Sequence, residues 1–182
     1  MSFEDYELAM QRKMEIAQWH VAFLPDLVDS PADPHELPPI ELQAHFEGAG
    51  RALASIPDQL ASGISEMLGE AIPSLPKPHR AYLNIICRKL PESSELREVL
   101  SRMVVDPRYC DLRDWRNRAT HRFDRKAMLD GLWVVAYPED CPDPVHTRDL
   151  MSYMRIMVDY GWGIVVEVPT VKSLASLLIY SM

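Results

Sequence analysis

The amino-acid sequence predicts an all-α protein built as a bundle of amphipathic helices. Its fifteen prolines cluster between long segments that almost lack proline, and it has only seven glycines. Apolar residues within these segments recur at spacings of three and four, which places them on one face of a helix. A length of 182 residues at 47% hydrophobic content suits a single domain over residues 1–182 with its own core.

Two long helices are expected in the first part of the chain. Residues 3–24 carry one apolar series, which the stretch "PDLVDSPADPHELPP" ends. Residues 39–69 carry a second and clearer series, and Pro57 inside it is expected to kink or split the helix. We take the first as an N-terminal helix added to a core of about residues 39–168.

Shorter helices are expected over residues 79–90 and 93–105. A further helix begins at "DPRY", where Asp106 suits the N-cap position and Pro107 the first helical position. This helix is expected to run to about residues 119–120.

The last part of the chain mixes two signals. The stretch "GLWVVAYPEDCPDP" predicts a short β segment around residues 132–137 and then a proline-rich loop. Apolar residues over 147–168 have helical spacing, but "GWGIVVEV" is rich in β-branched residues, so helix and strand both stay open after Gly161. A final short helix is expected after Pro169.

Basic charge is concentrated in one stretch of an otherwise acidic chain. The formal net charge is −8, from 19 basic and 27 acidic residues. Residues 108–126 hold seven of the basic residues and three of the acidic ones, which leaves 12 basic and 24 acidic residues elsewhere. This distribution favours a focused anion site over a surface that coats nucleic acid.

Other sequence patterns limit the class of protein. Cys87, Cys110 and Cys141 lie far apart, which argues against a disulfide framework and against zinc, and suits a reducing cytoplasm. The N-terminal stretch "MSFEDYELAM" does not have the pattern of a signal peptide, and no uninterrupted apolar run reaches the ~18 residues of a membrane span. We therefore expect a cytoplasmic protein with no membrane contact, no metal and no cofactor.

The candidate site is "RDWRNRATHRF", residues 113–123. A histidine with a near-neutral pKa can move protons to or from a ribose 2′-OH or a leaving oxygen, and an arginine can bind phosphate through two donors. Arg116 and His121 are five residues apart, or about 140° around a helix. They converge only if the helix ends near His121 or if a second copy of the helix supplies one of them. Asn117 can orient either group.

A structural explanation of the same stretch stays open. Asp114 and Arg118 have the spacing of a surface ion pair. Basic residues near a helix C-terminus also stabilise the helix dipole without any function. On this view the cluster is a solvated helix end.

The stretch "RNRATH" resembles the R-x4-6-H motif of the HEPN superfamily (higher eukaryotes and prokaryotes nucleotide-binding domains). Arg116 and His121 match with four residues between them, and Asn117 matches the polar residue after the arginine. The tight match covers about six residues, and the helical pattern over residues 39–123 also resembles that superfamily. The stretch that follows, "HRFDRKAMLDGLWVVAYP", resembles uncharacterised bacterial groups of it.

This resemblance implies a bundle of four to five main helices that dimerises through the motif helices. It implies a metal-independent endoribonuclease with a composite site across the homodimer, of the kind found in toxins and defence effectors. Arg116 would bind phosphate, His121 would transfer protons and Asn117 would orient them. On charge grounds alone we add three RNA-binding residues, Arg113, Arg118 and Arg122.

One position departs from the family pattern. Some HEPN toxins carry a tyrosine two positions after the histidine, which a partner antitoxin modifies, and here that position is Phe123. An antitoxin protein stays a candidate partner, but silencing by that route is doubtful. Because some members are inactive, the alternative function is a non-catalytic dimeric module that binds nucleotide, RNA or protein.

Overall fold

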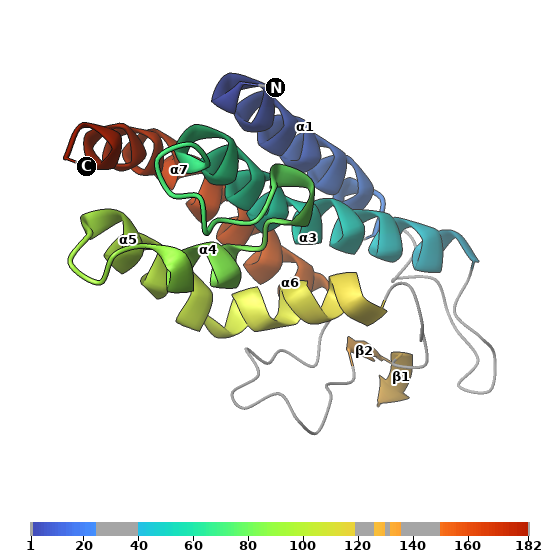
Figure 1. Ribbon diagram of the computed structural model, residues 1–182. Helices are drawn as coiled ribbons and strands as arrows, with labels where there is room; N and C mark the ends of the chain where they lie inside the picture. Colours follow the sequence, from blue (N-terminus) through green and yellow to red (C-terminus); the bar gives the residue numbers. More distant parts are fainter. Residues whose placement is uncertain (1, 25–39, 119–125, 130–131, 136–149, 182) are drawn as a thin grey trace.

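The computed structural model describes residues 2–24, 40–118, 126–129, 132–135 and 150–181, and it is mainly helical (Figure 1). This confirms the predicted all-α class. The elements in chain order are α1 (Phe3–Ala22), α3 (Ile40–Leu68), the short 3₁₀ helix η1 (Pro78–Arg80), α4 (Leu83–Lys89), α5 (Glu95–Val105), α6 (Pro107–Arg118), the strands β1 (Lys126–Leu129) and β2 (Leu132–Val135), and α7 (Leu150–Ser181).

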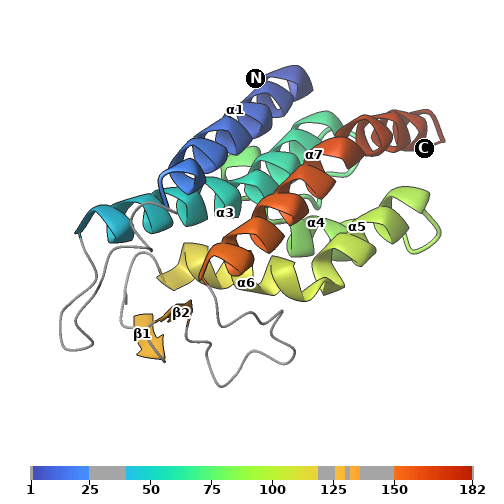
Figure 2. The ribbon, with the colours of Figure 1, turned by 180° about the vertical axis from the view of Figure 1, so that it is seen from behind.

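Helices α1 and α3 form an antiparallel hairpin, with α3 in the middle of the bundle and α1 at its edge (Figures 1 and 2). Near its open end, a Cβ atom on Gly63 of α3 would lie 3.0 Å from Cδ2 of Phe3 at the start of α1. The absence of a side chain there lets the two helices approach closely. Pro57 lies buried within α3, which continues through it as one helix and is not split.

Helix α7 differs most from the sequence prediction, because it continues as one helix through Gly161 and Pro169. No strand forms at "GWGIVVEV", and no separate helix begins after the proline. Ile164, Val168 and Val171 are buried at helical spacing, so packing against the core outweighs their β propensity. Pro169 is on an exposed position of the helix.

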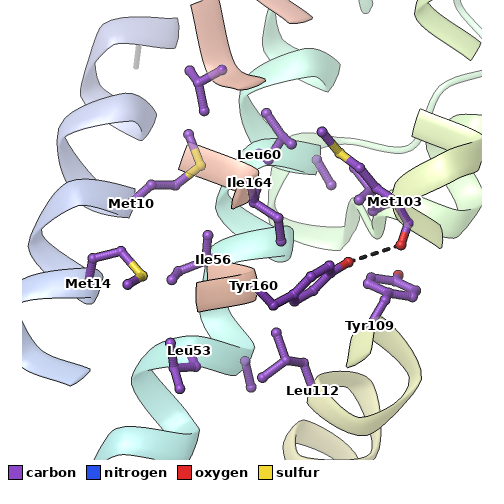
Figure 3. Close-up of a cluster of buried hydrophobic side chains, with 14 of the residues drawn as sticks. Met10, Met14, Leu53, Ile56, Leu60, Met103, Tyr109, Leu112, Tyr160 and Ile164 are labelled. Carbon is purple, nitrogen blue, oxygen red and sulfur yellow. Dashed lines mark hydrogen bonds between the residues drawn. The ribbon is translucent and has the colours of Figure 1, made fainter. Parts of the chain in front are cut away.

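Helix α7 packs across α1, α3 and α5, and this crossing holds the core together (Figure 2). A Cβ atom on Gly161 would lie 2.7 Å from Sδ of Met14 and 3.0 Å from Cδ2 of Leu53. Glycine is therefore needed at the crossing with α1 and α3. Figure 3 shows Met10 and Met14 of α1 packing toward the apolar side chains of α3 and α7.

The outer side of α7 is apolar as well. By length and composition alone, Met151–Ser181 could cross a membrane, with a mean hydropathy of 1.5 in its most apolar window. Only 22% of that window is buried, and the core helix of a soluble protein can pass the same test. Glu167 and Lys172 interrupt its apolar sequence, so the helix contains no uninterrupted apolar run of membrane length.

Strands β1 and β2 pair antiparallel, with Lys126 opposite Val135. β2 falls within the segment 132–137 for which a short β segment was predicted, and it contacts α7.

Candidate functional site

Helix α6, which carries the predicted motif, is fixed at its start by one carboxylate. The Arg108 amide donates to Oδ1 of Asp106 at 2.9 Å, and the Arg108 guanidinium donates to both oxygens, at 2.9 and 2.6 Å. Partial burial alone would raise the pKa of Asp106, but the hydrogen bonds and positive charge of Arg108 outweigh it and lower that pKa. The predicted N-cap therefore forms, with an ion pair added to it.

Two tyrosines join this end of α6 to the rest of the bundle. The Arg108 guanidinium lies 4.7 Å from the ring centroid of Tyr160 of α7. The Tyr160 hydroxyl donates to the carbonyl of Met103 at 2.9 Å, as Figure 3 shows. The hydroxyl of Tyr109 accepts from the amide of Asn84 at 3.4 Å. α6 is thus held by α4, α5 and α7 before it reaches the motif.

The far end of α6 lies beside the first half of α3 in both views (Figures 1 and 2). Tyr109 and Leu112 are buried on the side of α6 that faces the core. Position 116 follows them by seven and four residues, so it belongs to the same row of the helix.

Position 117 lies on a neighbouring row, which begins at Cys110 and continues through Arg113. The Arg113 side chain is half-buried. The structure places Arg116, Asn117 and Arg118 on the helix backbone, and their side chains lie outside what it describes. His121 and Arg122 also lie outside the described residues. Convergence of Arg116 and His121 stays a prediction.

Asp111 is a residue on this helix that the sequence did not single out. It is only 4% exposed, and it precedes Arg116 by five residues. A carboxylate stays buried only where positive charge or hydrogen bonds compensate it. The sequence "CDLRDW" gives no sign that this acid is a core residue.

Glu47 of α3 is less open than an ordinary surface acid. Its side chain is 18% exposed, and its carboxylate lies 3.6 Å from Nη2 of Arg51 on the same helix. An acid on an amphipathic helix is ordinarily exposed, and the burial of Glu47 differs from that. The ion pair with Arg51 gives Glu47 a structural role within α3.

Comparison with known proteins identifies no relative of the chain. No family model, no curated protein and no solved structure matches the chain.

Proposed function

We propose that the chain is an HEPN-type helical bundle that acts as a metal-independent endoribonuclease, with a composite site across a homodimer. The observation that carries the proposal is the sequence Arg116–Asn117–x3–His121 at the end of α6. On that helix, position 116 follows the buried residues Tyr109 and Leu112 by seven and four residues. The other end of α6 is fixed by Asp106 and Tyr160, so the helix is a rigid support for the motif.

The proposed reaction is cleavage of RNA by its own 2′-OH. His121 of one protomer takes the 2′-OH proton while that oxygen attacks phosphorus. The bond from phosphorus to the 5′-oxygen breaks, and this oxygen receives a proton from His121 of the second protomer. The products are a 2′,3′-cyclic phosphate and a 5′-hydroxyl. Arg116 binds the phosphate oxygens as negative charge develops on them, and Asn117 orients the two groups.

Local charge supports RNA as the substrate. Arg113, Arg118 and Arg122 add positive charge around the motif, whereas the rest of the chain has 12 basic and 24 acidic residues. Binding is therefore confined to a few phosphate contacts, and we expect a shallow dependence of affinity on salt.

The test is RNA cleavage by the purified protein in EDTA, compared with His121→Ala and Arg116→Ala. Exposed residues of the same types, His79 and Arg102, provide matched controls as His79→Ala and Arg102→Ala. Loss of proton transfer should slow cleavage about 100-fold or more in His121→Ala, while both controls keep wild-type rates. Cleavage products of the wild type should carry 2′,3′-cyclic phosphate ends.

Equal cleavage by all five proteins would mean a contaminating nuclease, and the proposed site would be abandoned. If none cleaves but the wild type alone binds RNA or nucleotide, the second function holds, namely a non-catalytic dimeric binding module. The acidic remainder of the chain favours that alternative, because it repels RNA everywhere except near α6.

The cellular role we propose is that of a cytoplasmic toxin or defence effector, controlled by an antitoxin protein. Expression of the wild type should then arrest growth, and His121→Ala should not. Because Phe123 has no hydroxyl, the antitoxin would have to act by binding and not by modifying this position.

A further inference from the structure

Two histidines from different helices meet at the closed end of the α1–α3 hairpin. Nδ1 of His20 on α1 lies 3.3 Å from Nδ1 of His45 on α3. The two rings are nearly perpendicular, with an interplanar angle of 70°. The Trp19 ring lies beside both, with centroid distances of 4.9 Å to His20 and 5.5 Å to His45. We call His20 and His45 the histidine pair.

The place of His20 depends on a glycine. A Cβ atom on Gly48 of α3 would lie only 2.3 Å from Cε1 and Nε2 of His20. Any other residue at position 48 would push the ring away from His45. The chain therefore keeps room for this ring against the backbone of α3, one turn after His45.

The distance within the pair suits shared coordination of a metal ion. Two imidazole nitrogens bound to one tetrahedral ion at 2.0–2.1 Å are about 3.3 Å apart. A hydrogen bond between two neutral rings accounts for a similar distance, so the separation alone does not choose between them. Both rings are partly exposed, which leaves them accessible to an ion from solvent.

We propose that the histidine pair is an open binding site for a divalent cation that prefers imidazole ligands, and that Zn²⁺ is the ion whose tetrahedral geometry the separation fits. Cu²⁺, which binds such ligands more tightly, serves as the probe. Over the residues that the structure describes, no group of three or more His, Cys, Asp or Glu side chains could hold a metal. Water therefore completes the coordination. Helices α1 and α6 lie on opposite sides of α3, so the histidine pair does not share a face of α3 with α6 (Figures 1 and 2).

Trp19 provides a direct readout, since bound Cu²⁺ quenches the fluorescence of a tryptophan this close. We would titrate the purified full chain with Cu²⁺ and follow tryptophan emission. The wild type should show saturable quenching at one equivalent, which Zn²⁺ in excess reverses. Trp19→Phe should lose the quenchable part of the emission.

His20→Gln and His45→Gln should each raise the Cu²⁺ concentration at half-maximal quenching by roughly 10- to 100-fold. This is at least the loss of metal affinity seen when a residue that only supports a ligand is removed. His79→Gln is the control, because His79 is an exposed histidine on η1. If His20→Gln fails to fold, His45→Gln decides, because its ring does not fill the space above Gly48.

Quenching that persists in either histidine variant, or that does not saturate, would overturn the site and leave a plain hydrogen bond between two rings. The site is equally overturned if Trp19→Phe is quenched like the wild type. Either result is independent of the nuclease proposal, which is tested in EDTA.

Discussion

At the scale of single residues, Asp106 combines a helix cap with an ion pair. We expect Asp106→Ala to lower the free energy of unfolding by about 1 kcal/mol or more, because the amide of Arg108 loses its acceptor. Asp106→Asn should lose less, since an amide oxygen can still cap the helix. Urea denaturation at pH 7 measures both.

The pH dependence of Asp106 separates the charge from the cap. The pKa of the folded carboxyl is below its ordinary value of 3.8. Its contribution is therefore complete above that value and is lost as the pH falls through the lower folded pKa. The gap between wild type and either variant should shrink as the pH falls below 3.8. A constant gap would show that the charge contributes nothing. Glu92→Gln, which removes a carboxylate that is 91% exposed, is the control and should change little.

Asp111 leads to a second prediction at this scale. We expect Asp111→Ala to lower the free energy of unfolding by about 3–5 kcal/mol, because removal of a buried carboxylate leaves its compensating groups buried without it. Asp111→Asn keeps the shape and should cost less. Thermal unfolding followed by circular dichroism checks the order. A loss under ~1 kcal/mol in both variants would mean that the buried carboxylate of Asp111 contributes little to stability.

At the scale of elements, the sequence predicted the helices whose boundaries are marked by caps or prolines. α1, α3, α5 and α6 begin and end within a few residues of their predicted limits. The prediction failed at α7, where local propensity and packing disagree. Pro169 and the β-branched run after Gly161 pointed to a break, whereas the buried face of the helix extends through both.

The two glycines of "GWG" test why α7 stays helical. Gly161 lies in the crossing with α1 and α3, whereas a Cβ atom on Gly163 would have nothing within 4 Å. We expect Gly163→Ala to stabilise the protein by about 0.5–1 kcal/mol, because alanine favours a helix. Gly161→Ala should instead destabilise it by about 1 kcal/mol, because the new methyl group overpacks against Met14 and Leu53. Chemical denaturation measures the free energy of unfolding of both variants. Stabilisation by both would show that the crossing has room for a methyl group at position 161.

Contacts between helices explain why the sequence alone did not predict the histidine pair or the burial of Asp111. The histidine pair requires only that α1 and α3 form an antiparallel hairpin, in which a residue near the end of α1 meets one near the start of α3. With that topology, His20 and His45 could have been paired in advance. The burial of Asp111 had no such signal, since it depends on how α6 is rotated against α3.

At the scale of the whole molecule, two surfaces compete as the dimer interface. The proposed composite site requires contact between the two copies of α6. The outer side of α7, however, exposes apolar residues that recur at helical spacing, with Val166 71% and Leu177 59% exposed. Exposed apolar patches of this kind often mark interfaces. The oligomeric state therefore bears directly on the proposed chemistry.

Light scattering on two charge variants separates these surfaces. If the α6 helices form the interface, Arg113→Glu should weaken the dimer, because it removes the interactions that the half-buried Arg113 side chain makes there, and Val166→Glu should leave the mass unchanged. Circular dichroism of both variants controls for folding. The reverse pattern, a monomeric Val166→Glu and a dimeric Arg113→Glu, would place the interface on α7 and remove the second His121 from the site. The proposed exchange of protons between two histidines would then have no second partner, and cleavage by this mechanism would have to be given up.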